Sequence, residues 1–105
     1  MRVLVFGDSI TQGFFYIFEG GWVNQLLVNF QQEALKNLHG AWPEVFNLGV
    51  DGDTAKGVLT RMSNEVKARR LFSEDELIVL AVGINDSLLR DNIVANEVNV
   101  FQETY

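Results

Sequence analysis

The sequence predicts an α/β protein with three layers, α/β/α, in which a parallel sheet of about three strands lies between helices. Three observations support this fold class. Short, continuously apolar runs of β-branched and aromatic residues are typical of strands buried inside a parallel sheet. These runs alternate along the chain with longer segments whose apolar residues recur at helical spacing. The chain has 105 residues, of which 48% are hydrophobic and 21% charged, as expected for one globular domain.

The first predicted strand leads directly to a serine. Residues 3–6 (Val-Leu-Val-Phe) predict a strand buried on both faces, and Gly7, Asp8 and Ser9 follow it. Ligands bind at the carboxyl ends of the strands in open α/β sheets, so Ser9 stands where a nucleophile would meet a substrate. The alternative is structural, because Gly, Asp and Ser are common in turns, and Asp8 or Ser9 could cap a following helix.

A loop rich in glycine and aromatic side chains comes next. Residues 13–21 have no clear hydrophobic period and therefore predict irregular structure. The aromatic side chains of Phe14, Phe15, Tyr16 and Phe18 could line a pocket for an acyl or aryl group. Alternatively, they could simply cover the edge of the sheet.

The first long helix and the second strand follow this loop. Apolar residues recur at helical spacing over residues 22–38, and Gly40 and Pro43 end the predicted helix. Residues 45–50 (Val-Phe-Asn-Leu-Gly-Val) predict the second strand. Residues 51–54 (Asp-Gly-Asp-Thr) then combine a turn signal with a residue suited to cap a helix.

The remaining chain continues the alternation. Residues 55–66 carry apolar side chains at helical spacing and predict a second long helix. Residues 77–82 (Leu-Ile-Val-Leu-Ala-Val) predict a third buried strand, which runs into residues 83–86 (Gly-Ile-Asn-Asp). Residues 99–102 (Asn-Val-Phe-Gln) resemble the capped start of a third helix.

This order predicts one functional edge. Alternating strands and helices form a parallel sheet, and in the flavodoxin-like order the first strand lies between the other two. The loops carrying Ser9, Gly52 and Asn85 would then surround a single crevice. Acyl transfer needs a nucleophile and donors for the oxygen that becomes negative, which the Ser9 hydroxyl, the backbone N–H groups of Ser9 and Gly52, and the Asn85 amide could supply. Structural alternatives are a turn that requires Gly52 and a helix cap formed by Asn85 and Asp86.

Bulk composition excludes several functional classes. The formal net charge of −6 argues against nucleic-acid binding, and the only basic cluster (Lys67, Arg69 and Arg70) suits a solvated helix end. Because the chain has no cysteine, disulfides and thiolate catalysis are excluded. We recognise no signal peptide and no apolar run that approaches the length of a membrane span, so we expect a cytoplasmic protein.

Three motifs carry a resemblance to a known family. Residues 7–11 (Gly-Asp-Ser-Ile-Thr) resemble the first sequence block of the GDSL, or SGNH, hydrolases, with Ile10 replacing the Leu of the family's name. Residues 47–54 (Asn-Leu-Gly-Val-Asp-Gly-Asp-Thr) resemble the second block, and residues 83–86 resemble the third, Gly-x-Asn-Asp. The motifs occur in order after successive strands, so the resemblance spans nearly the whole chain.

The resemblance implies a function and a set of site residues. Ser9 would be the nucleophile that forms an acyl-enzyme, and the oxyanion hole would be made by the backbone N–H of Ser9, by Gly52 and by Asn85. Asp8 would hold the serine loop. The family hydrolyses esters and thioesters, including lipids, acyl-CoA, aryl esters and acetylated sugars, and it uses no metal and no cofactor. The expected partner is therefore a small ester substrate, and the oligomeric state stays open.

One part of the family's machinery is missing from the sequence. The last block, Asp-x-x-His, supplies the base that activates the serine, and it does not occur here. The only histidine, His39, follows the first long helix and would lie on the order of 25 Å from Ser9 at ~1.5 Å per residue. We therefore expect residues 1–105 to be the N-terminal portion of a longer hydrolase domain, inactive and only marginally stable by itself.

A second function from a different class is a binding module. A flavodoxin-like or receiver-like domain would use the same edge to hold a phosphate or another small ligand without chemistry. However, phosphate sites favour longer glycine-rich loops, and residues 7–9 are short and acidic. Covalent labelling of Ser9 would distinguish the esterase from the binding module.

Overall fold

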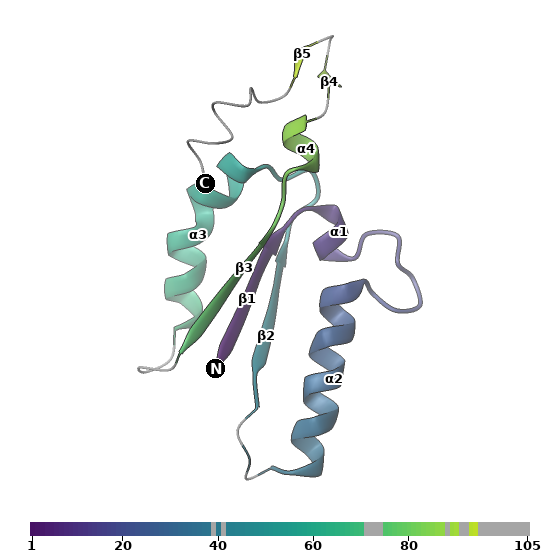
Figure 1. Ribbon diagram of the computed structural model, residues 1–105, viewed down its shortest axis with the longest axis vertical. Helices are drawn as coiled ribbons and strands as arrows, with labels where there is room; N and C mark the ends of the chain where they lie inside the picture. Colours follow the sequence, from purple (N-terminus) through teal and green to yellow (C-terminus); the bar gives the residue numbers. More distant parts are fainter. Residues whose placement is uncertain (39, 41, 71–74, 88, 91–92, 95–105) are drawn as a thin grey trace.

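Three parallel strands form the centre of the computed structural model, which describes residues 1–38, 40, 42–70, 75–87, 89–90 and 93–94 (Figure 1). The strands are β1 (Arg2–Gly7), β2 (Glu44–Gly49) and β3 (Glu76–Ala81). Their order is β2-β1-β3, so the first strand lies between the other two, as the flavodoxin-like arrangement predicts. All six residues of β1 are buried, which confirms the predicted central strand.

The strands end level with one another, and this alignment positions the site. In the two parallel ladders, Gly7 pairs with Gly49 of β2 on one side and with Ala81 of β3 on the other. Beyond the ladder, the N–H of Val50 donates to the carbonyl of Gly7 at 3.1 Å. The segments that follow the three strands therefore leave the sheet at the same edge.

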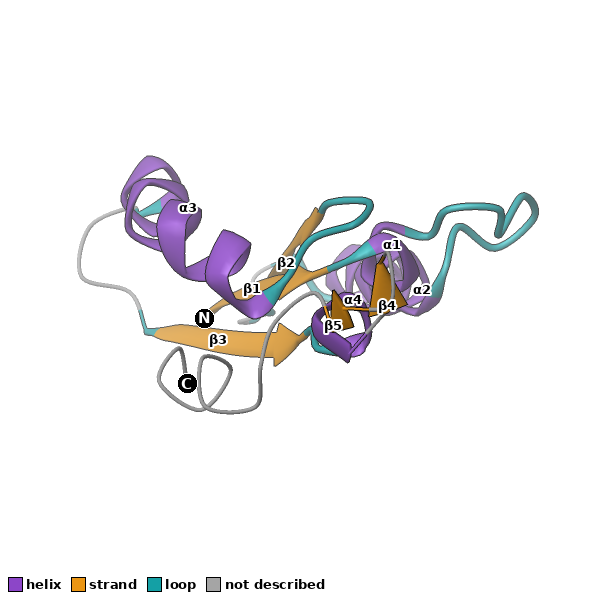
Figure 2. Ribbon diagram, turned by 90° about the horizontal axis from the view of Figure 1, so that it is seen from above, coloured by secondary structure: helices purple, strands orange, loops and turns teal. Residues whose placement is uncertain are grey.

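Two long helices cover opposite faces of the sheet (Figures 1 and 2). These are α2 (Trp22–Lys36) and α3 (Ala55–Arg69). Because side chains alternate along a strand, odd and even residues of β1 contribute to different cores. The core facing α3 contains Leu4, Phe6, Leu48, Val58 and Val66, whereas the core facing α2 contains Val3, Val5, Val23 and Val45. The predicted three-layer α/β/α arrangement is confirmed.

Four short elements complete the described structure. Helix α1 (Ser9–Gln12) follows β1, and helix α4 (Ile84–Ser87) begins three residues after β3 ends. Strands β4 (Leu89–Arg90) and β5 (Ile93–Val94) form a small antiparallel pair. The sequence pattern did not predict these elements, because four-residue helices and two-residue strands span about one hydrophobic period, which is too short for a repeat to be recognised.

Two predictions about the longer elements require correction. Helix α2 ends at Lys36, two residues before the predicted end at Leu38. More importantly, the third strand is not buried, since Leu77, Ile78 and Leu80 are 47%, 41% and 42% exposed. Strand β3 lies at the edge of the described sheet, paired only with β1, so its apolar side chains lack the neighbours that bury those of the central strand.

Two other predictions fall on residues outside the described part of the chain. These are the position of His39 relative to Ser9 and the third helix expected near residues 99–102. Within the described residues, no helix combines the length and the apolarity needed to cross a membrane.

Close packing of α1 on the end of β2 leads to a test of stability. A Cβ atom at Gly49 would lie 2.7 Å from Cα of Gln12 and 2.9 Å from the carbonyl oxygen of Asp8, both backbone atoms. We expect Gly49→Ala to lower the free energy of unfolding by about 1 to 3 kcal/mol, as typical for overpacking. Chemical denaturation would measure the loss. The exposed control Ser63→Ala should change stability by less than about 0.5 kcal/mol, and an equal effect of both substitutions would contradict the packing account.

Candidate active site

Ser9 is the first residue of α1 and is half-buried at the edge where β1 ends. The preceding Asp8 is the helix N-cap, and its Oδ1 accepts the N–H of Ile10 at 3.0 Å. As the first helical residue, Ser9 has no carbonyl one turn earlier in the helix to accept its own N–H. The structural interpretation of residues 7–9 is therefore confirmed, because Asp8 caps the helix that Ser9 begins, and the role of Ser9 as a nucleophile stays a prediction.

The side chain of Asn47, near the end of β2, ties that strand to α1. Its Nδ2 donates to the carbonyl of Thr11 at 2.9 Å, and its Oδ1 accepts the N–H of Gly49 at 3.0 Å. Nδ2 also approaches Oδ1 of Asn24 in α2 at 3.3 Å. One carboxamide thus holds together the helix that carries Ser9, the end of β2 and the start of α2.

Gly52 lies in a tight turn that follows β2. The N–H of Asp53 donates to the carbonyl of Val50 at 3.0 Å, and Gly52 occupies the third position of that turn with φ +79°. A left-handed residue at this position favours glycine, so the predicted turn is present. A Cβ atom built on Gly52 would meet no atom within 4 Å, so the space over this backbone is open.

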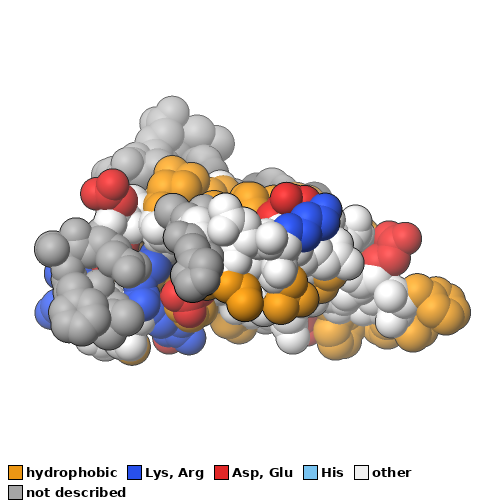
Figure 3. Space-filling view, turned by 90° about the horizontal axis from the view of Figure 1, so that it is seen from below, with side chains coloured by type: hydrophobic (Ala, Val, Ile, Leu, Met, Phe, Trp, Pro, Cys, Tyr) orange, Lys and Arg blue, Asp and Glu red, His pale blue; other side chains and the backbone are white. Residues whose placement is uncertain are grey.

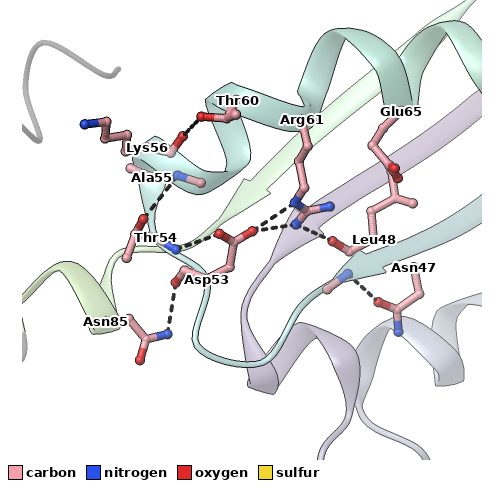
Figure 4. A network of polar contacts seen from close by, with 12 residues as sticks. Asn47, Leu48, Asp53, Thr54, Ala55, Lys56, Thr60, Arg61, Glu65 and Asn85 are labelled. Carbon is pink, nitrogen blue, oxygen red and sulfur yellow. Dashed lines mark hydrogen bonds and ion pairs between the residues drawn. The ribbon is translucent and has the colours of Figure 1, made fainter.

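Asn85 and Asp86 hold the residues that follow Gly52 at two points, of which Figure 4 shows the contact of Asn85. Nδ2 of Asn85 donates to the carbonyl of Asp53 at 3.0 Å. The buried carboxylate of Asp86 accepts the N–H of Ala55, the first residue of α3, at 3.0 Å. Thr54 is the N-cap of α3, and Asp86 accepts a further N–H at the same end of that helix, whereas the sequence-based alternative had Asp86 capping the helix that follows. We call this pair of contacts the Asn85–Asp86 clasp.

A second network holds the same turn from the side of α3 (Figure 4). Arg61 donates from Nε and from a terminal nitrogen to Oδ2 of Asp53, at 3.0 and 2.7 Å, and that terminal nitrogen also donates to the carbonyl of Leu48 at 2.8 Å. The other carboxylate oxygen of Asp53 accepts the N–H of Thr54 at 2.9 Å. The Asp53 carboxylate is thus engaged in holding backbone and the Arg61 guanidinium.

Sequence reasoning did not find Arg61, and only a weak signal pointed to its partners. Arg61 is eight residues from Asp53 and thirteen from Leu48, the residue of β2 that it contacts, so no local motif links them. The weak signal is Gly57 in α3, because a Cβ atom at this position would collide with Oδ1 of Asp53. A glycine inside a helix often marks such a close approach, but the sequence does not reveal which group approaches.

A cavity opens directly beside Ser9. It has a volume of about 520 Å³ and is lined by Ser9, Ile10, Phe14, Phe15, Tyr16 and Asp51. Its wall thus combines the nucleophile candidate, aromatic rings from the loop after α1, and the residue that precedes Gly52. In the described residues, no group of three or more His, Cys, Asp or Glu side chains is placed to hold a metal ion.

We call the loop of residues 13–21 the aromatic loop. The structure contradicts one of the two sequence-based interpretations of its aromatic side chains. The side chains of Phe15, Ile17 and Phe18 are more than 80% exposed, so they do not cover the sheet edge. Phe14, Phe15 and Tyr16 contribute to the cavity at Ser9, as the other interpretation expects of a pocket. Figure 2 shows the loop projecting away from the sheet beyond α1 and α2.

The three segments that carry the candidate residues thus leave the sheet at the same edge and are linked to one another. Ser9 and the residue before Gly52 share a cavity, and Asn85 bonds to the residue after Gly52. Comparison with known families adds a decisive observation, because the GDSL-like Lipase/Acylhydrolase family model matches residues 5–104. The chain belongs to this family. Its members are esterases and lipases, and the family resemblance of the three motifs is thereby confirmed.

Solved structures related to this GDSL-like chain share its fold. The acetyl xylan esterase AlAXEase matches with a TM-score of 0.73 at 24% identity, over 100% of this chain and 48% of that one. TesA matches with a TM-score of 0.71 at 26% identity, over 99% and 49%. A lipase/acylhydrolase from Enterococcus faecalis matches with a TM-score of 0.62 at 30% identity, over 98% and 47%. The GDSL-like chain therefore spans about half the length of these structures. A comparison with curated protein sequences found no match.

The contact between Arg61 and Asp53 leads to a second test of stability. The Asp53 side chain is only 10% exposed, so Arg61→Met would leave a largely buried carboxylate without its cation. We expect the free energy of unfolding at neutral pH to fall by about 2 to 3 kcal/mol. In the double variant with Asp53→Asn, the loss should be smaller than the sum of the two single losses.

The matched control is the exposed ion pair of Lys36 and Glu33, whose side chains are 73% and 68% exposed. Lys36→Met should change stability by less than about 0.5 kcal/mol, because solvent screens such pairs. Denaturant titration of all four variants gives the comparison. Strict additivity of Arg61→Met and Asp53→Asn would show that the two side chains are not coupled.

Proposed function

We propose that Ser9 attacks the carbonyl carbon of a carboxylic ester or thioester and forms an acyl-enzyme. The negative oxygen of the tetrahedral intermediate is held by the backbone N–H groups of Ser9 and Gly52 and by the side-chain amide of Asn85. The observation that carries this proposal is the hydrogen bond from Asn85 to the carbonyl of Asp53, next to Gly52 and in the same turn as Asp51, which lines the cavity beside Ser9.

The Asn85 amide suits an oxyanion donor because, among the described residues, one of its two N–H bonds is engaged. An Asn NH₂ group carries two N–H bonds, and the carbonyl of Asp53 accepts one of them. That bond fixes the orientation of the carboxamide before substrate arrives and leaves the second N–H for the oxyanion. Donors held in place in this way stabilise a transition state without reorganisation, and one of them contributes roughly 3 to 4 kcal/mol.

The backbone of Gly52 supports the same role. The turn holds its φ at +79°, and no atom lies within 4 Å of the position a side chain would occupy. An ester group can therefore approach this backbone closely. The N–H of Ser9 contributes from the N-terminal turn of α1, where helix N–H groups lack intrahelical acceptors.

We propose that the base that activates Ser9 comes from outside the described residues, which include no histidine. The described carboxylates of Asp8 and Asp53 both accept backbone N–H groups, and Asp53 also pairs with Arg61. A serine hydroxyl is a poor nucleophile until a base takes its proton, a task for which histidine oriented by a carboxylate is suited. We therefore propose that residues 1–105 are the N-terminal portion of a hydrolase domain whose C-terminal portion supplies Asp-x-x-His.

The cavity beside Ser9 supports a hydrophobic acyl or aryl ester as the substrate. Its aromatic lining from Phe14, Phe15 and Tyr16 favours apolar groups over a sugar ring, which needs many hydrogen-bond partners. The chemistry requires neither a metal nor a cofactor, because the hydroxyl, the base and the oxyanion donors complete acyl transfer. A cytoplasmic location stays a prediction.

Covalent labelling with a fluorophosphonate tests the proposal on the chain of 105 residues. Imidazole added to the solution replaces the missing base, so we expect little labelling of Ser9 without imidazole and clear labelling with it, measured by mass spectrometry. Ser9→Ala should abolish the label. Asn85→Ala should slow labelling about 100-fold through loss of one oxyanion donor.

The control is Ser87→Ala, which removes an exposed hydroxyl from the same helix as Asn85. It should leave the labelling rate unchanged. If the folded chain is not labelled at any imidazole concentration, the binding module becomes the better interpretation. Rapid turnover of an ester without any added base would instead contradict the assignment of the base to a missing C-terminal portion.

A further inference from the structure

We propose that the aromatic loop docks this protein onto the surface of an uncharged lipid aggregate, such as a vesicle, micelle or droplet of neutral or zwitterionic lipid. The loop's central residues, 14–18, are a continuous apolar run of Phe-Phe-Tyr-Ile-Phe. Three of these side chains are almost free of protein contact, since Phe15, Ile17 and Phe18 are 85%, 84% and 98% exposed. A contiguous apolar patch of this kind marks an interaction site.

The loop is built to hold these side chains outward. Its two ends meet backbone to backbone, because a Cβ atom at Gly21 would lie 2.7 Å from Cα of Gly13. Inside the loop, the N–H of Tyr16 donates to the carbonyl of Gly13 at 3.0 Å, and the N–H of Gly20 donates to the carbonyl of Tyr16 at 2.8 Å. Compact loops with closed ends are frequently functional.

Backbone strain in the loop supports the same interpretation. Phe15 has φ +69° and is the one residue other than glycine with a positive φ in the described part of the chain. The left-handed conformation is unfavourable for a residue with a side chain, and such strain tends to occur at functional positions. Here it accompanies a phenylalanine ring that is exposed rather than packed against the core.

The charges of the protein favour an uncharged lipid surface over an anionic one. The sequence contains no lysine or arginine between Arg2 and Lys36, whereas Asp8, Glu19 and Glu33 lie in that segment. In Figure 3, hydrophobic side chains gather at the right-hand tip, with acidic side chains beside them and basic ones farther away. With a net charge of −6, the protein would be repelled by anionic lipid, so an uncharged surface is the better partner.

The aromatic loop lies next to Ser9 in the structure. The loop begins at Gly13, the residue that follows α1, and Phe14, Phe15 and Tyr16 also line the cavity beside Ser9. A lipid surface that receives the tip of the loop would therefore face the mouth of that cavity. The consequence that lipid esters reach Ser9 from this surface rests on the proposed function, whereas the docking itself does not.

Flotation with phosphatidylcholine vesicles tests the docking on the 105-residue chain. We expect the protein to float with the vesicles, and Phe15→Ser/Ile17→Ser/Phe18→Ser to lower the partition constant about 100-fold, because binding scales with the apolar area buried. Phe18→Ser alone should lower it several-fold without affecting folding, since this side chain contacts almost nothing. Circular dichroism checks the fold of each variant.

The matched control exchanges three exposed leucines elsewhere in the chain for serine. Leu35, Leu38 and Leu59 are 75%, 62% and 55% exposed and lie outside the aromatic loop. Leu35→Ser/Leu38→Ser/Leu59→Ser should change the partition constant less than about threefold. Binding should be insensitive to added salt and should weaken when phosphatidylserine is included, because no cationic patch contributes.

Several results would overturn the docking proposal. They are absence of flotation for the folded wild-type chain, equal loss in the loop and control variants, or binding that requires anionic lipid. Loop-dependent dimers in analytical ultracentrifugation, without vesicle binding, would assign the loop to a second copy of the chain instead. Ser9→Ala should bind vesicles normally, so failure of labelling at Ser9 and failure of docking are independent outcomes.

Discussion

Hydrogen bonding of β1 on both of its edges is the constraint on which the rest of the structure depends. Because β2 and β3 pair with it in the same register, Gly7, Gly49 and Ala81 lie side by side at the end of the sheet. Every chemically interesting segment follows directly from that row. The alternating side chains of the same strand also form the centre of both cores. A shift of one residue in either ladder would exchange the two cores and separate the loops of the site.

The alignment of the strands brings three loops to one edge, and polar contacts then fix how they face one another. The Asn85–Asp86 clasp joins the loop after β3 to the loop after β2, while Asn47 joins the end of β2 to α1. The guanidinium of Arg61 in α3 holds the carboxylate of Asp53. Each contact satisfies a backbone group or a largely buried charge that would otherwise be costly, so stability and site geometry have the same cause.

The edge of the molecule that carries Ser9 therefore combines a rigid part with a projecting part. The rigid part consists of short turns held by carboxamide, carboxylate and guanidinium groups, as the proposed alignment of a nucleophile with oxyanion donors requires. The projecting part is the aromatic loop, which extends apolar side chains into solvent beside the same cavity. The family is one of ester hydrolases, and this division suits a substrate with a reactive carbonyl and an apolar portion.

The sequence by itself determined the fold class, the strand order and the residues that meet at the edge. Apolar periodicity and the motifs at residues 7–11, 47–54 and 83–86 report on local structure, which the chain encodes over a few neighbouring positions. Only the tertiary structure decided that Arg61 reaches Asp53, that Asp86 accepts an N–H at the start of α3 rather than capping its own helix, and that the third strand is exposed. These features depend on which groups lie opposite one another across the fold, and no local pattern in one sequence specifies that.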